Sequence, residues 1–138
     1  MPPLPRPEPG LVLHYEFLWS HESEPEKRRP CVILTTETFG GRTVVTVVPT
    51  TTKEPKNPAL AIKVPPKVKQ ALGLDSSPSW FVISELNEFD WPGPHIHYVP
   101  RRWNHLHYGY LPPALFKTVK DAVLALDANR KKVMKRPG

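Results

Sequence analysis

Residues 30–51 read Pro-Cys-Val-Ile-Leu-Thr-Thr-Glu-Thr-Phe-Gly-Gly-Arg-Thr-Val-Val-Thr-Val-Val-Pro-Thr-Thr, and this stretch decides the fold. Residues 31–36 and 43–49 are rich in valine, isoleucine and threonine, which favour β-strands. Gly40 and Gly41 stand between them, and two adjacent glycines allow the positive φ angles of a tight hairpin turn. We therefore predict two antiparallel strands joined at this turn.

The segment before the hairpin has the alternation of another strand. Apolar side chains occupy every second position, at Leu11, Leu13, Tyr15, Phe17 and Trp19. This period of two is typical of a half-buried strand. A polar, charged loop is expected over residues 20–29, between this strand and the hairpin.

The segments after the hairpin predict short strands and two helices. Strands are expected over residues 60–64, 80–83 and 96–99, with a short helix from Pro65-Pro66 that ends at Gly73. Pro112-Pro113 begins a long helix, because proline suits the first helical turn. The apolar stripe of this helix consists of Leu115, Val119, Ala122, Val123 and Leu126.

These elements predict a mainly β fold with helices. We expect a small SH3-like β-barrel with a short inserted helix and a C-terminal helix, because closing a sheet removes its exposed edges. The length of 138 residues fits one domain. The expected organisation is a proline-rich arm over 1–9, a barrel domain over 10–128 and a basic tail over 129–138.

The composition bounds the location of the protein. The lone cysteine, Cys31, lies in an apolar run, so an intrachain disulfide is excluded and a cytoplasmic location is expected. No apolar run approaches the roughly 20 residues of a membrane helix. The first nine residues contain five prolines and lack the apolar core of a signal peptide.

The formal net charge of +6 comes largely from basic clusters. These clusters are Lys27-Arg28-Arg29, Arg101-Arg102 and the C-terminal tail, and the aromatic residues Trp91 and Trp103 lie among them in the sequence. Basic patches interleaved with aromatic rings favour a nucleic-acid partner. A basic protein with a solvated tail is the alternative.

Four kinds of polar side chain are expected at one end of the predicted hairpin. His21-Glu22 and Arg29 precede its first strand, and Thr51 follows its second. Cleavage of RNA by its own 2′-hydroxyl needs a base, an acid, and donors where the phosphoryl charge grows. The set is therefore suited to gripping and cleaving a phosphodiester.

The chain resembles the PemK/MazF toxin family from about residue 10 to residue 126. The motifs that carry the resemblance are the His21-Glu22 loop, Arg29-Pro30, Pro49-x-Thr51, the acidic Glu85 after a strand, and Gly109-Tyr110-Leu111. Their order and spacing are more specific than any one of them. The block Asn87-x-Phe89-x-Trp91-Pro-Gly is distinctive and indicates a divergent branch.

The resemblance implies a homodimeric endoribonuclease that cuts single-stranded RNA without metal or cofactor and is neutralised by an antitoxin. Arg29 would then grip the scissile phosphate and protonate the leaving oxygen. Thr51 would donate its hydroxyl to the phosphate. His21 would act in the catalytic loop, and Glu85 is at the position where some members place a general base. The nucleic-acid-binding set would be Lys27, Arg28, Glu22, Arg101, Arg102 and Trp91.

Two departures from the family pattern favour a second hypothesis. Some members carry an arginine two positions before the acidic residue, where this chain has Ile83. The loop from His21 to Arg29 is also longer than is usual. A non-catalytic SH3-like module that binds nucleic acid or a protein in the same groove is therefore the main alternative. A gyrase-directed poison ranks last, because the chain ends in basic rather than aromatic residues.

Two histidine pairs raise the question of a metal site. His95 with His97, and His105 with His107, could each present two imidazoles on one face of an extended segment. No carboxylate or thiol completes a recognisable ligand pattern around them. We therefore expect no metal.

Overall fold

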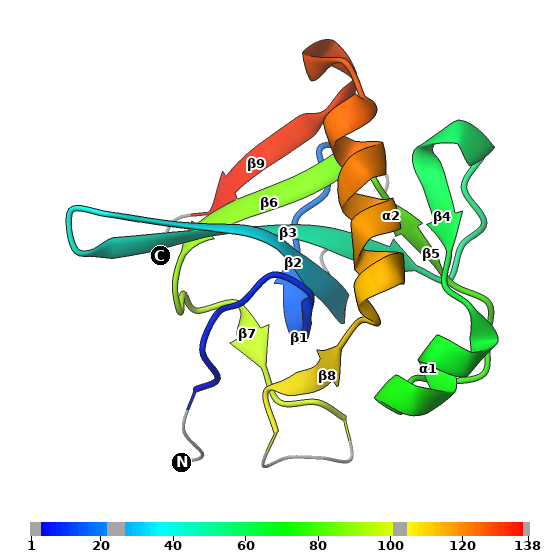
Figure 1. Ribbon diagram of the computed structural model, residues 1–138, viewed down its shortest axis with the longest axis horizontal. Helices are drawn as coiled ribbons and strands as arrows, with labels where there is room; N and C mark the ends of the chain where they lie inside the picture. Colours follow the sequence, from blue (N-terminus) through cyan, green and yellow to red (C-terminus); the bar gives the residue numbers. More distant parts are fainter. Residues whose placement is uncertain (1–3, 22–26, 101–104, 137–138) are drawn as a thin grey trace.

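The computed structural model describes residues 4–21, 27–100 and 105–136. Its centre is formed by three long strands, β1 (Leu11–Phe17), β2 (Lys27–Phe39) and β3 (Arg42–Thr51) (Figure 1). β2 pairs antiparallel with both neighbours. The turn between β2 and β3 has φ values of 57° at Gly40 and 76° at Gly41, so the predicted hairpin is confirmed.

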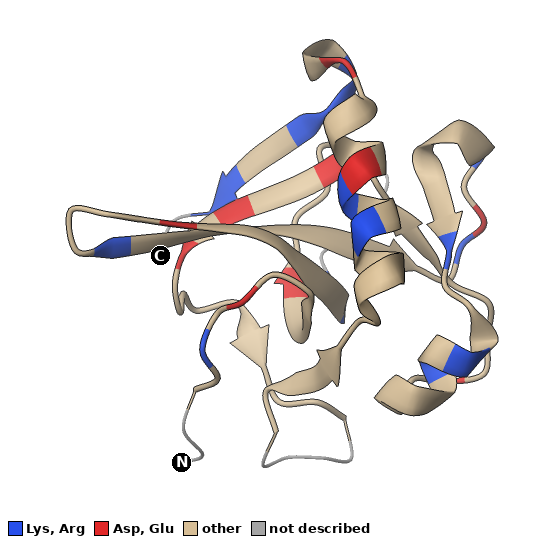
Figure 2. Ribbon diagram, in the orientation of Figure 1, with Lys and Arg blue, Asp and Glu red and all other residues tan. Residues whose placement is uncertain are grey.

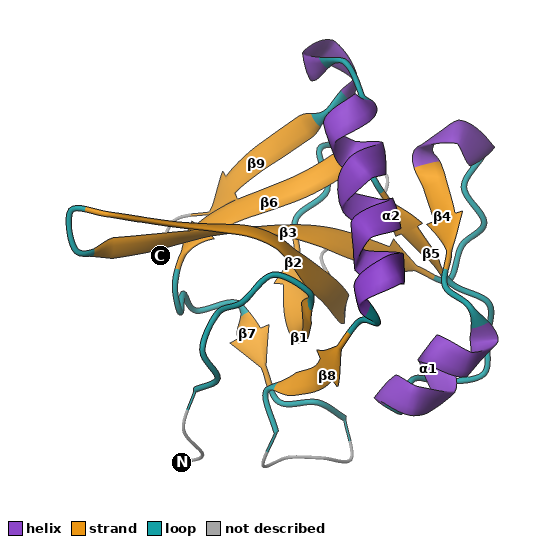
Figure 3. Ribbon diagram, in the orientation of Figure 1, coloured by secondary structure: helices purple, strands orange, loops and turns teal. Residues whose placement is uncertain are grey.

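The remaining elements surround this centre. They are β4 (Ala61–Lys63), α1 (Pro66–Leu72), β5 (Trp80–Val82), β6 (Glu85–Asp90), β7 (Ile96–His97), β8 (His107–Tyr110), α2 (Pro113–Ala125) and β9 (Lys132–Arg136), with short 3-10 turns at Pro58–Leu60 and Ala128–Arg130. Figure 3 shows that strands dominate and that the two α-helices lie beside the sheet. The mainly β fold class with an inserted and a C-terminal helix is confirmed.

The sheet is open rather than closed. Its strand order is β4-β5-β3-β2-β1-β7, with β6 added on β3, β8 on β1 and β9 on β6. The described strands therefore do not close into the expected barrel. The edge strands β4, β7 and β8 are short and β9 is basic, and these two features protect the edges of an open sheet.

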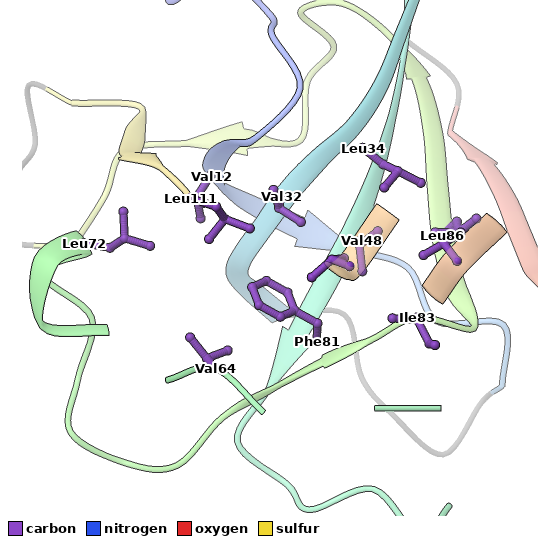
Figure 4. Close-up of a cluster of buried hydrophobic side chains, with 12 residues drawn as sticks. Val12, Val32, Leu34, Val48, Val64, Leu72, Phe81, Ile83, Leu86 and Leu111 are labelled. Carbon is purple, nitrogen blue, oxygen red and sulfur yellow. The ribbon is translucent and has the colours of Figure 1, made fainter. Parts of the chain in front are cut away.

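β1 is buried on both faces, so the prediction of a half-buried strand is wrong. Val12 faces one apolar cluster together with Val32 and Val48, and Leu13 and Tyr15 face a second cluster across the sheet. Figure 4 shows the first cluster, in which residues from β1, β2 and β3 meet Phe81 and Leu86. Alternation was visible in the sequence only because His14 and Glu16 interrupt the apolar run.

α2 covers the first cluster. Pro113 occupies its first turn, as predicted. Val119 and Val123 are fully buried against the sheet, and Leu115 and Leu126 pack at the margin. The predicted apolar stripe is therefore used inside the domain, so it does not provide a surface for a second copy of the chain.

The expected C-terminal tail is part of the sheet. Residues 132–136 form β9, which pairs in parallel with β6 from Glu85↔Lys132 to Phe89↔Arg136. Figure 2 shows basic residues along β9. Clustered positive charges and few apolar residues gave this segment the appearance of a solvated tail, although charged residues are common on edge strands. The domain therefore extends beyond its predicted end at residue 128.

Two further differences from the predictions matter for the site: the start of β2 and the presence of β8. β2 begins at Lys27, so its charged residues belong to the strand and not to the preceding loop. β8 was not predicted, because it is only four residues long and contains a glycine, so its pattern is too short to indicate a strand. Within the described residues, no helix has the length and apolar character needed to span a membrane.

Candidate functional site

The start of β2 and the end of β3 lie side by side. Their antiparallel register pairs Cys31 with Pro49, which brings Arg29 next to the Thr50-Thr51 pair. The Nη1 atom of Arg29 donates a hydrogen bond to the carbonyl oxygen of Thr50 at 3.2 Å. The structure therefore brings together the arginine and threonine that the sequence placed at one end of the hairpin.

The guanidinium of Arg29 lies over an indole ring. Its Cζ atom is 5.0 Å from the ring centroid of Trp19, and that indole is buried. The same indole contacts the ring of His21, with the centroids 5.7 Å apart. A cation–π contact and a hydrogen bond together restrain the planar guanidinium, which otherwise has many rotamers. The sequence identified Trp19 only as a strand residue, and no local signal indicated its contact with Arg29.

Arg28 and Arg29 project to opposite faces of β2, because successive strand residues alternate. Arg28 is paired in register with Glu16, and the next residue on the same face, Pro30, is paired with His14. Arg28 therefore shares a face with His14, while Arg29 shares its face with Trp19. The two arginines therefore leave β2 in different directions.

The two threonines at the end of β3 have different surroundings. Thr50 is buried, and its Oγ1 donates to the carbonyl oxygen of Pro30 at 2.7 Å. Thr51 is half-buried, and its Oγ1 accepts a hydrogen bond from the backbone N–H of Lys53 at 3.1 Å. An acceptor contact uses only a lone pair, so the hydroxyl hydrogen of Thr51 can still be donated to a ligand.

Three neighbouring cavities form a groove across these strand ends. The His21 cavity of about 320 Å³ is lined by Trp19, His21, Thr51, Lys53, Glu54, Pro55, Lys56 and Val82. The Arg29 cavity of about 310 Å³ is lined by Lys27, Arg28, Arg29, Pro30, Thr50, Thr51, Thr52, Lys53 and Asp75. The Tyr108 cavity of about 220 Å³ is lined by His14, Arg28, Pro30, Thr50, Thr52, Lys69, Gly73, Leu74, Asp75, Ser79 and Tyr108. Each shares wall residues with the next, so the Arg29 cavity lies between the other two.

The model of one protein family matches most of the chain. The description of this family is PemK-like, MazF-like toxin of type II toxin-antitoxin system, and the match covers residues 8–126. The chain belongs to this family. A search of curated proteins found no match. Membership confirms the predicted resemblance and makes this protein a toxin of a type II system, whose members bind an antitoxin protein.

The start of the toxin's first loop is held by two side chains of β6. Asn87 is fully buried, accepts a hydrogen bond from the Leu18 N–H at 2.9 Å and donates to the Leu18 carbonyl oxygen at 2.8 Å. Glu85 is also buried and accepts from both the backbone N–H and the hydroxyl of Ser20, at 2.8 and 2.7 Å. Leu18 and Ser20 flank Trp19, so these contacts fix the position of Trp19. Trp19 in turn holds the guanidinium of Arg29.

Other predicted binding residues of the toxin are divided among several places. Lys27 and Arg28 line the Arg29 cavity. Trp91 instead donates a backbone hydrogen bond to the carbonyl oxygen of Thr43. Thr43 lies eight residues before Thr51 on β3, a separation of about 25 Å along the strand. The structure therefore separates Trp91 from the groove. Glu22, Arg101 and Arg102 lie outside the described residues.

His14 and Tyr108 form an interacting pair that sequence reasoning missed. The Tyr108 hydroxyl is 2.9 Å from Nδ1 of His14. Burial, with smaller contributions from His97 and the Arg28 charge, lowers the pKa of His14 from 6.5 to about 4. The imidazole is therefore neutral at neutral pH. The residues are 94 positions apart, so no local pattern could have linked them.

The His95 and His97 pair approaches one carboxylate. Their ring nitrogens lie 3.7 and 3.8 Å from Oε2 of Glu16, and His95 also contacts the guanidinium of Arg136 at 3.0 Å. Among the described residues, no group of three or more histidine, cysteine or acidic side chains could hold a metal ion. These histidines connect β1, β7 and β9.

Proposed function

We propose that this toxin is an endoribonuclease that cleaves single-stranded RNA in the groove, without a metal ion and as a homodimer. The observation that carries the proposal is the restrained guanidinium of Arg29, held by Trp19 and Thr50 in the wall of a basic groove. A planar arginine fork matches two phosphate oxygens, and a preorganised cation stabilises charge that develops during phosphoryl transfer.

The groove residues can be assigned to the steps of RNA cleavage. The 2′-oxygen attacks the phosphorus, the bond to the 5′-oxygen breaks, and a proton moves from the 2′-hydroxyl to a base and from an acid to the 5′-oxygen. Arg29 is the proposed acid that protonates the 5′-oxygen, and together with the hydroxyl of Thr51 it stabilises the phosphoryl oxygens. His21, which lines the adjoining cavity, is the proposed base. Aromatic rings along a basic groove favour single strands, whose bases can stack.

The homodimer rests on the family and not on the apolar stripe of α2, which the domain itself covers. Members of the family are typically homodimeric. Light scattering at tens of micromolar protein should therefore give twice the monomer mass, and a monomer there would contradict this part of the proposal.

The test of the activity is cleavage in the presence of a chelator. Wild-type protein should cut labelled single-stranded RNA in EDTA, leave a fragment with a 5′-hydroxyl, and spare a duplex of the same sequence. An Arg29→Ala preparation purified identically controls for contaminating nucleases. Activity that EDTA abolishes and a divalent ion restores would contradict the metal-free mechanism.

A non-catalytic RNA-binding module is the second candidate, and the surroundings of Ile83 and Glu85 favour it. Ile83 replaces a family arginine and is buried in the first apolar cluster. Both carboxylate oxygens of Glu85 are bonded to Ser20. Neither residue lines the groove cavities: Ile83 belongs to the apolar core, and Glu85 supports the loop. Binding of single-stranded RNA with no cleavage by the wild type would favour this candidate.

The same geometry predicts a mild effect for Glu85→Gln. Glutamine can accept the Ser20 N–H and donate to its hydroxyl, so cleavage should remain within about tenfold of the wild type. Loss of a general base typically costs about a hundredfold or more. Single-turnover cleavage rates of the variant separate these outcomes, and a loss beyond a hundredfold would restore the predicted catalytic role of Glu85.

A further inference from the structure

The Tyr108 cavity adjoins the proposed cleavage site without containing Arg29. It shares Arg28, Thr50 and Asp75 with the Arg29 cavity and extends beyond them to His14 and Tyr108. A single strand whose scissile phosphate lies at Arg29 therefore has a neighbouring nucleotide within reach of this cavity. The groups that line it differ from those around Arg29.

A β-bulge places Tyr108 in this wall. Val12 pairs with Gly109 and Leu13 pairs with His107, so Tyr108 is an extra residue opposite β1. Gly109 supports the irregularity with a φ of 115°, which residues other than glycine rarely adopt. Bulges re-aim side chains and are frequent next to active sites. The result here is the contact between the Tyr108 hydroxyl and His14 across the two strands.

The lining of this cavity is poorly matched to a phosphate. His14 is buried and neutral, so it offers hydrogen-bonding nitrogens without a positive charge. Lys69 is also buried, and its ammonium group is bonded to the Asp75 carboxylate and to the Ser77 carbonyl oxygen. Phosphate contacts instead fall to Arg28 at the shared wall and to Arg29 beyond it.

The lining does match the edge of a nucleobase. Nδ1 of His14 is bonded to Tyr108, so Nε2 is the ring nitrogen left for a ligand, as a donor or an acceptor according to the tautomer. The Tyr108 hydroxyl can donate to Nδ1 or accept from it, so in either tautomer this bond holds the imidazole ring in place and leaves Nε2 with the complementary role. Base edges are read by donor and acceptor groups of this kind, and RNA-binding proteins read unstacked bases in this way.

We propose that the Tyr108 cavity is a nucleobase subsite, in which His14 reads the base next to the scissile phosphate and Tyr108 holds the imidazole of His14 in position. This inference rests on the proposed function, because it requires single-stranded RNA in the groove. His14 is the specificity-determining residue, and Tyr108 is its positioning residue.

The experiment uses a single-stranded RNA pool randomised at six consecutive positions. Cut products are sequenced for the wild type, His14→Gln, Tyr108→Phe and Tyr110→Phe. The wild type should prefer one base at a position adjoining the cut. His14→Gln and Tyr108→Phe should weaken or redirect that preference by about tenfold, the usual value of one good hydrogen bond, while preferences elsewhere persist.

Tyr110→Phe is the matched control. Tyr110 lies two residues after Tyr108 on β8 and is exposed. Its hydroxyl donates a hydrogen bond to the carboxylate of Glu8, which is not a groove residue. Its variant should keep the wild-type preference. Unchanged preference in both His14→Gln and Tyr108→Phe, with cleavage retained, would overturn the subsite and leave the endoribonuclease intact.

A selection for RNA binding from the same pool distinguishes failure of the subsite proposal from failure of the proposed function. If the wild type binds but does not cut, the bases enriched in bound RNA replace the cut-site readout, and the same variants should shift them. Enrichment that is equal in the wild type and both groove variants would overturn the subsite. RNA that is neither bound nor cut would overturn the proposed function and the subsite together.

Discussion

Replacement of Arg29 by alanine is expected to lower the rate of RNA cleavage by about a hundredfold or more. Loss of one preorganised donor to a developing negative charge commonly has an effect of this size. Binding of uncleavable RNA should weaken much less, because Lys27 and Arg28 still line the same cavity and attract phosphates. Single-turnover rates and affinities for a 2′-deoxy substrate, measured at one salt concentration, give the two quantities separately.

Arg28→Ala is the matched control, since it removes the same charge from the adjacent position. Arg28 projects to the opposite face of β2 from Arg29. The Arg28→Ala substitution should therefore modestly lower the affinity for RNA and the salt dependence of that affinity, while the rate of the cleavage step stays nearly unchanged. Arg29→Lys adds a second comparison, because lysine keeps the charge and loses both the planar fork and the stacking on Trp19. Equal effects of the two alanine substitutions in both assays would make the arginines a nonspecific basic surface and favour the non-catalytic module.

Asn87→Ala is expected to destabilise the fold by about 2–4 kcal/mol, because it leaves the N–H and carbonyl of Leu18 without their partner. Urea unfolding monitored by tryptophan fluorescence measures this loss. Cleavage should also fall at temperatures where the variant is folded, since the anchored segment carries Trp19, which holds Arg29. The effect joins two segments that are 69 positions apart in the sequence.

Asn57→Ala provides the comparison for Asn87→Ala. Asn57 is an exposed residue that caps a 3-10 turn through one hydrogen bond to the Ala59 N–H. Loss of such a cap costs about 1 kcal/mol or less, and cleavage should not change. If both asparagine substitutions had equally small effects on unfolding, the anchoring role of Asn87 would be refuted.

Local patterns in the sequence were sufficient for the hairpin, for both helices and for the central pair of the site. Gly40-Gly41 has the backbone freedom that the turn requires, and paired prolines mark the helix starts. Once two strands are joined by a tight turn, their approximate register follows, so Arg29 and Thr51 had to lie at one end even though the pairing shifts by one residue between Ile33 and Thr35. Chain connectivity imposes these relations, and neighbouring residues are enough to reveal them.

Contacts between distant segments were decided only by the tertiary structure. Packing against α2 and a second apolar cluster buries β1 on both faces, and pairing with β6 turns the basic C-terminal segment into β9. The separation of Trp91 from the groove and the meeting of His14 with Tyr108 depend on how strands pair across the sheet. Such pairings are selected by the burial and hydrogen bonding of the whole domain, for which no single stretch of sequence carries the signal.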